Sequence, residues 1–153
     1  MNLAQGHVVW FSDESARRAF IHEHPEGKLV SPEIPLRMNL SVQENIAVIF
    51  QYRNNLKNEE AETKARSLLD LAGQTSCALK RDSDLTTEQR FVAKLIRSVI
   101  LSPPLILIDR PSLLLPDTRY PGFLEHVLEI YKPMIREYQI LEYEWNKPLY
   151  TLQ

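Results

Sequence analysis

Residues 85–111 read LTTEQRFVAKLIRSVILSPPLILIDRP and decide the fold. A helix is predicted to begin near Thr86, because apolar residues recur from there at a spacing of three and four and prolines at 103–104 end the pattern. Residues 105–108 are apolar on both faces, which is typical of a central strand covered by helices on each side. The stretch therefore indicates an α/β layered fold. The predicted apolar stripe of the helix is Val92, Leu95, Ile96, Val99 and Ile100, and its predicted polar face is Arg90, Lys94 and Arg97.

Two more helices are predicted before this stretch. One begins at Ser41, where Glu44 follows three residues later in a capping-box arrangement. The other covers residues 58–73, with acidic residues in its first turn and glycine at its end. These helices predict a helical subdomain over residues 41–101.

Shorter runs on either side complete the predicted fold. Strands are expected at residues 7–11, 28–31 and 139–143, and helices at 13–22 and 123–131. Because helices alternate with the strands, the sheet is expected to be short and mostly parallel. Residues 111–116 are expected to connect the strand at 105–108 to the helix at 123–131 without a regular element.

Composition narrows the class of protein. The chain has 153 residues, of which 44% are hydrophobic, and this predicts one domain over residues 1–153. A formal charge of -2 argues against nucleic acid as a partner. Cys77 has no cysteine with which to pair, and the N-terminus does not read as a signal peptide, so a cytoplasmic setting is expected. The longest apolar run, 105–108, is too short to span a bilayer, so contact with a membrane would be peripheral, at its inner face.

Three segments together resemble the ATP-binding subunits of ABC transporters. Residues 85–89 (LTTEQ) align with the signature LSGGQ, and residues 105–111 (LILIDRP) align with the Walker B strand and its Asp-Glu-Pro. Residues 39–46 (NLSVQENI) align with the family's N-L-T-V-x-E-N-I. Their order and spacing match the family over about half the chain. The resemblance implies a P-loop-NTPase-like fold, of which this chain would be a fragment.

The same comparison implies that the nucleotide site is degenerate. The family binds phosphates with G-x-x-x-x-G-K-[ST], and this pattern is absent from the sequence. The single Gly-Lys pair, Gly27-Lys28, is followed by Leu29. Residues 6–9 resemble the strand after the phosphate-loop helix, so the chain is expected to start about where that helix would end.

The Walker B alignment keeps one acidic residue and loses the other. Asp109 aligns with the aspartate that orients Mg²⁺, whereas Arg110 replaces the catalytic glutamate. A guanidinium stays protonated and cannot act as a general base, so hydrolysis should fall by a factor of about 10²–10⁴. No catalytic residue is predicted. By the same alignment, the Q-loop glutamine falls near Ser31 or Pro32, and the switch histidine falls near Glu144 or Trp145.

The signature is also altered. Its two glycines become Thr87 and Glu88, which add bulk and a negative charge where the family approaches phosphate. The degenerate signature is thus Leu85, Thr86, Thr87, Glu88 and Gln89.

Several of these residues have purely structural interpretations. Thr86 and Gln89 have the spacing of a capping box, and Asp109 is expected to pair with Arg110, although a ligand role for Asp109 stays open. His22, His24 and Glu26 are not expected to bind metal, because they alternate in a proline-containing loop. Cys77 is expected in the core.

Two functional hypotheses follow. In the first, the chain is a degenerate ABC-type subunit that does not hydrolyse ATP alone and acts as a structural or regulatory partner in a transport complex. In the second, it is a fragment or subunit of a working ATPase, and a partner chain completes hydrolysis. Neither hypothesis gives the chain its own cofactor, because ATP and Mg²⁺ would come through a partner. The expected partner is a second copy, or a membrane or ATPase subunit of a transporter.

Overall fold

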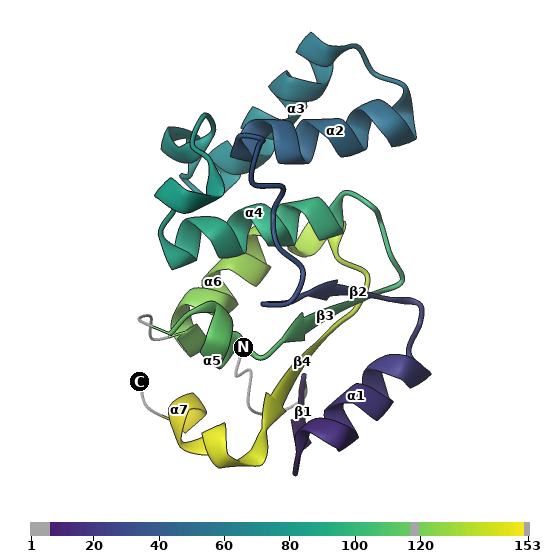
Figure 1. Ribbon diagram of the computed structural model, residues 1–153, viewed down its shortest axis with the longest axis vertical. Helices are drawn as coiled ribbons and strands as arrows, with labels where there is room; N and C mark the ends of the chain where they lie inside the picture. The colour runs from purple at the N-terminus through teal and green to yellow at the C-terminus, as the bar shows by residue number, and fades with distance from the viewer. Residues whose placement is uncertain (1–6, 117–119, 152–153) are drawn as a thin grey trace. The chain divides into compact units, whose positions relative to one another are not determined.

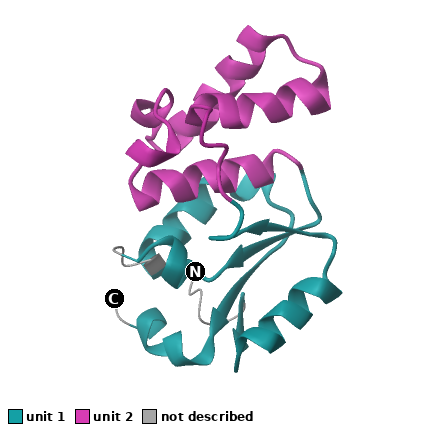
Figure 2. Cartoon of the chain, viewed as in Figure 1, with its two compact units in different colours: residues 1–34, 102–153 teal, residues 35–101 magenta. Residues whose placement is uncertain are grey.

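The computed structural model describes residues 7–116 and 120–151, and the chain forms two compact units. Unit 1 combines Met1–Ile34 with Ser102–Gln153, and unit 2 is Pro35–Leu101 (Figure 2). The helical stretch 41–101 lies within unit 2. The number of independently folding domains stays a prediction.

Unit 1 is built on a four-stranded parallel sheet of order β1-β4-β3-β2 (Figure 1). The strands are β1 (Val8–Phe11), β2 (Gly27–Val30), β3 (Leu105–Asp109) and β4 (Tyr138–Tyr143). The four strands confirm the predicted α/β class. β3 is buried along its whole length, as expected of a central strand in a parallel sheet.

The helices of unit 1 follow the strands. They are α1 (Glu14–Glu23), α5 (Pro111–Leu114), α6 (Tyr120–Tyr131) and α7 (Lys147–Thr151). The short helices α5 and α7 were not predicted, because one or two turns carry too little periodicity to be recognised. Proline at the first position of α5 starts it, since the missing N–H is not needed there.

Alternate residues of the strands pack on the two faces of the sheet. Leu105 and Leu107 on β3 join Phe11 and Leu141 in a buried cluster. From α1, Ala16, Phe20 and Ile21 pack against this cluster. The opposite face carries Ile106, Ile108 and Ile140, which are buried as well.

Unit 2 contains α2 (Val42–Asn54), α3 (Asn58–Leu71) and α4 (Thr87–Val99). Both predicted capping boxes are confirmed, at Ser41 for α2 and at Thr86 for α4. Cys77 is buried, as predicted. Within the described residues, none of the helices of either unit is both long and apolar enough to cross a membrane.

The stripe of α4 is confirmed in part. Val92, Leu95, Ile96 and Val99 are buried, and Ile100 is half-buried. The prediction was wrong for Lys94, which was placed on the polar face but is only 5% exposed. A lysine can bury its aliphatic stem, and burial lowers the pKa of its ammonium group, as do Arg97 and Arg90 nearby.

Candidate functional site

The candidate site lies in unit 1, where the parallel strands end at the same edge of the sheet. Asp109 is the last residue of β3 and is only 1% exposed. Ser31 follows β2 directly, and Glu142 and Tyr143 close β4. At this edge α/β folds commonly bind ligands, because the loops after neighbouring strands converge there.

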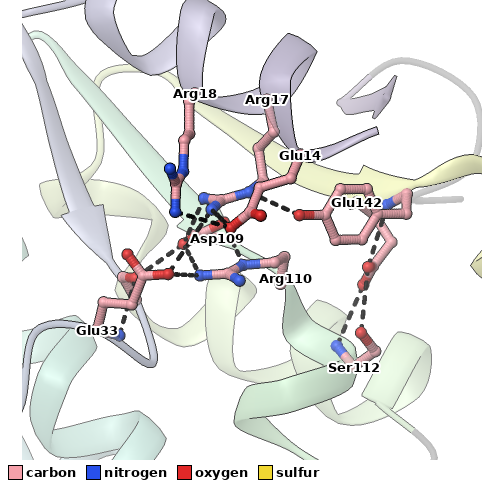
Figure 3. A network of polar contacts seen from close by, with 10 residues as sticks. Glu14, Arg17, Arg18, Glu33, Asp109, Arg110, Ser112 and Glu142 are labelled. Carbon is pink, nitrogen blue, oxygen red and sulfur yellow. Dashed lines mark hydrogen bonds and ion pairs between the residues drawn. The ribbon is translucent and has the colours of Figure 1, made fainter. Parts of the chain in front are cut away.

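Asp109 accepts five hydrogen bonds from three described residues (Figure 3). Arg17 Nη1 donates to both carboxylate oxygens, at 3.0 Å and 3.1 Å. Arg110 donates through Nε and Nη2, each at 3.0 Å. Ser31 Oγ donates to Oδ2 at 2.8 Å. The carboxylate is therefore enclosed by two guanidinium groups and one hydroxyl, and the predicted pairing of Asp109 with Arg110 is confirmed.

Arg110 holds a backbone conformation that is uncommon for its residue type. Its φ of 53° and ψ of 67° lie in the left-handed region, directly before Pro111. Its side chain turns back onto Asp109 and also donates from Nη2 to Glu33 Oε1 at 2.7 Å. Burial by itself opposes the charge, but the hydrogen bonds to Asp109 and Glu33 outweigh it and raise the pKa of Arg110 above its ordinary value. This residue is a permanent cation.

Arg17 reaches the same centre from α1. Asp13 caps this helix by accepting from the backbone N–H of Ala16 at 2.8 Å. The Arg17 side chain, 2% exposed, donates from Nε to Tyr143 Oη at 3.1 Å. Its Nη2 lies 3.8 Å from Glu14 Oε1 and 3.7 Å from Glu33 Oε1. The second buried cation is thus fixed by contacts with α1, β3 and β4.

Glu33 differs from the other members of the cluster because its side chain is 62% exposed. Hydrogen bonding and charge from Arg110, with charge from Arg17 and Arg18, lower the pKa of this carboxyl below its ordinary value. The exposed pair between Arg18 and Glu14, at 3.0 Å, flanks it. We call Arg17, Ser31, Glu33, Asp109 and Arg110 the Asp109 cluster.

A second buried carboxylate, Glu142, lies at the end of β4. It is 0% exposed and accepts from the backbone N–H and hydroxyl of Ser112, each at 3.1 Å. Further donors are the Tyr143 backbone N–H at 3.2 Å, Asn146 Nδ2 at 3.0 Å and Tyr150 Oη at 3.3 Å. These neutral donors satisfy the carboxylate and join β4 to α5, α7 and the 3₁₀ turn at 144–146.

The residues predicted for the degenerate signature lie in unit 2. Leu85 precedes α4, Thr86 caps it, and Thr87 and Glu88 form its first turn. Gln89 Oε1 accepts from the Thr86 backbone N–H at 3.0 Å, and Thr86 Oγ1 accepts from the Gln89 backbone N–H at 3.1 Å. The capping interpretation of Thr86 and Gln89 is therefore confirmed.

Residues near the predicted family motifs have structural partners. Ser31, near the expected Q-loop position, bonds Asp109, and Trp145, near the expected switch position, stacks on Tyr143 with ring centroids 4.2 Å apart. Gly27 begins β2, where an added Cβ would lie 2.6 Å from Leu107 Cδ1, so close packing requires glycine there.

The loop histidine has a local role in the helix. His24 follows the last turn of α1, where its Nδ1 lies 2.7 Å from the carbonyl oxygen of Phe20 and its ring stacks on the Phe20 ring. Across the described parts of the chain, no three His, Cys, Asp or Glu side chains are grouped in a way that could hold a metal ion.

The sequence interpretation missed three members of the site: Arg17, Glu33 and Glu142. Two of them had a detectable signal. Arg17 shares a helix face with the apolar Phe20 and Ile21, three and four residues later, which marks it as buried. Glu142 lies two residues after Ile140, on the same face of the predicted strand, and this spacing also marks it as buried. Glu33 lies in a position where exposure is ordinary, so its sequence neighbours gave no such signal.

Comparison with known proteins supports the fold. No family model matches the chain. Among solved structures, the chain is similar to the ATP-binding cassette MJ0796, solved as a dimer in a post-hydrolysis state bound to ADP and Pi. The TM-score is 0.61 at 21% sequence identity, and the match covers 88% of this chain and 58% of that chain. The likeness supports an ABC-ATPase-like fold, and this chain spans 58% of the length of the protein that it matches.

Proposed function

We propose that this ABC-ATPase-like chain is a degenerate subunit that does not hydrolyse ATP alone and serves as a structural or regulatory partner in a transport complex. The observation that carries the proposal is the enclosure of Asp109. Both of its oxygens accept hydrogen bonds from Arg17 and Arg110, and Oδ2 also accepts from Ser31. In an active ATPase of this type, the resemblance assigns the aspartate to Mg²⁺.

Mg²⁺ and the two guanidinium groups compete for the same oxygens. The ion prefers oxygen ligands at about 2.0–2.1 Å in octahedral geometry, with several waters retained. Here two cationic groups lie within 3.1 Å of the carboxylate oxygens. Binding Mg²⁺ would require both arginines to leave a buried partner and would place a divalent cation beside them. The arginines therefore take over the role of the metal in neutralising Asp109.

The connection from β1 to α1 supports the same proposal. A phosphate loop joins a strand to a helix and presents the helix amides to phosphate. β1 and α1 have this order, but only Ser12 and Asp13 separate them. The Asp13 carboxylate already accepts from the amide of Ala16. We therefore favour β1–α1 as the counterpart of the phosphate-loop unit, in place of the sequence-based expectation that the chain starts after it.

Arg110 argues against the alternative function. If a partner chain completed hydrolysis, a general base would still be needed beside Asp109. Arg110 occupies that place as a permanent cation, and general-base catalysis is worth about 10²–10⁴ in rate. The alternative, a fragment or subunit of a working ATPase, would have to draw its base, its ATP and its Mg²⁺ from the partner chain.

The partners proposed for the chain are consistent with its fold. The MJ0796 structure is dimeric, which is consistent with a partner being a second copy or another ATPase subunit. A membrane subunit of a transporter is the other candidate, and the chain would then act at the cytoplasmic face of a membrane. The charge of -2 gives no reason to add nucleic acid.

Calorimetric titration with Mg-ATP tests the proposal. The isolated chain should show no micromolar binding, and Arg110→Glu should fold and still lack ATPase activity, because Asp109 would remain paired with Arg17. Micromolar binding by the isolated chain, or turnover by Arg110→Glu, would contradict the proposal. A titration in the presence of a candidate transporter subunit addresses the alternative, since turnover only in the mixture would favour it.

A further inference from the structure

The buried part of the Asp109 cluster carries unequal charge. Two guanidinium groups, on side chains 2% and 9% exposed, surround one carboxylate that is 1% exposed. The buried groups Arg17, Arg110 and Asp109 therefore sum to one positive charge. A buried excess charge is costly unless a counter-ion lies close by.

Glu33 supplies the counter-ion from the surface. Its Oε1 lies 2.7 Å from Arg110 Nη2 and 3.7 Å from Arg17 Nη2, so both contacts use the same oxygen. At 62% exposure the side chain is the most accessible member of the cluster. Because only the Glu33 side of this pair is exposed, another carboxylate can reach the same place and exchange with Glu33 without leaving the arginines unpaired.

The surroundings of Glu33 would favour any carboxylate in its place. Arg110 Nη2 donates a hydrogen bond to this position, Arg17 Nη2 on α1 lies 3.7 Å from it, and Arg18 adds a third guanidinium nearby (Figure 3). Hydrogen bonds from arginine to carboxylate are short and charge-assisted. The guanidinium groups are held by Asp109 and Tyr143 whether or not Glu33 is present, so the site is already formed.

We propose that Arg17 and Arg110 form a carboxylate-binding site, which Glu33 fills in the isolated chain and an acidic segment of a partner protein can take over. The inference rests on the proposed function, in which this edge of the sheet serves a partner and not a nucleotide. Glu33 is then an internal competitor. Its removal should raise the affinity of the site for a carboxylate supplied by another chain.

Titration of the full chain with a hexaglutamate peptide at low ionic strength tests the inference. Because Glu33 competes from within the same chain at high effective concentration, Glu33→Gln should bind the peptide about tenfold more tightly than the unchanged chain. Glu26→Gln is the matched control, since it makes the same change in net charge at an exposed position. It should bind as the unchanged chain does.

Two double variants identify which arginine is responsible for the tighter peptide binding of Glu33→Gln. Adding Arg110→Gln to Glu33→Gln should abolish it, whereas adding Arg18→Gln should retain most of it, because Arg18 is 69% exposed and paired with Glu14. Equal gains in Glu33→Gln and Glu26→Gln would overturn the inference, and so would equally tight binding of inorganic phosphate. Mg-ATP binding by the unchanged chain would refute the proposed function instead, so the two failures can be told apart.

Discussion

At the scale of single residues, burial determines how strongly each charge depends on its partners. Asp109 is almost inaccessible to water and has two cationic partners, so losing one of them leaves it paired. The two arginines share one buried carboxylate, so losing Asp109 leaves both without their main counter-ion. The exposed pair of Arg18 and Glu14, by contrast, is solvated on both sides. Substitutions at Asp109, Arg17 and Arg18 should therefore differ in their effect on stability.

One substitution at each of these positions measures the difference. Asp109→Asn should lower the free energy of unfolding by about 3–5 kcal/mol, because two buried guanidinium groups lose their counter-ion. Arg17→Met should lower it by about 1.5–3 kcal/mol, because a charged hydrogen-bonding group is lost while Arg110 still neutralises Asp109. Arg18→Met should cost less than about 1 kcal/mol. Urea denaturation gives all three values, and a cost for Arg18→Met equal to that for Asp109→Asn would contradict the argument.

The residue scale also shows how much of the site could be predicted from the sequence. Asp109 and Arg110 are adjacent, so their pairing required only local chemistry. Arg17 and Ser31 lie 92 and 78 residues from Asp109, and only the tertiary fold brings them together. The helix face of Arg17 could have revealed that it is buried, but not its partner. Glu33, which is exposed and 77 residues from Arg110, could not have been found without the structure.

At the scale of secondary-structure elements, prediction succeeded where local chemistry decides the outcome. The capping boxes at Ser41 and Thr86 involve residues three positions apart, and the structure contains both. The apolar stripe of α4 follows from a spacing of three and four. Lys94 was misplaced because the pattern treats every lysine as exposed, whereas its burial depends on what packs around the helix. The short α5 and α7 fell below the length at which periodicity is informative.

Ile96 tests the packing of α4. The residue is 0% exposed, so Ile96→Asp would bury a carboxylate without a designed partner and should lower the free energy of unfolding by more than about 4 kcal/mol. Leu71→Asp at the end of α3 is the matched control, because Leu71 is 54% exposed. It should lower stability by about 1 kcal/mol or less, because a carboxylate in the last turn meets the negative end of the helix dipole but stays solvated. Circular dichroism during denaturation compares them, and a folded Ile96→Asp chain of ordinary stability would show that α4 does not bury this face.

At the scale of the whole molecule, the strand order could not be predicted. The sequence predicted four strands, but β4, the last in the chain, lies between β1 and β3 in the sheet. Val8 on β1 pairs with Ile140 on β4, at opposite ends of the chain. Parallel strands need crossover connections, so local pattern gives the strands and not their neighbours. The Asp109 cluster depends on this order, since it places the end of β3 between Ser31, which follows β2, and Tyr143 of β4, which accepts a hydrogen bond from Arg17.

β4 lies between β1 and β3, so the sheet of unit 1 should depend on it. A chain that ends at Glu137 lacks β4, so β1 loses its partner and β3 keeps only β2. Two short parallel strands cannot bury both faces of a sheet, and unit 1 should therefore not fold. Amide hydrogen exchange should show β1 and β3 unprotected in this chain, whereas a chain that ends at Thr151 should retain their protection. Protected β3 amides in the shorter chain would mean that β2 and the helices stabilise the strand without β4, and the Asp109 cluster would then not require the complete sheet.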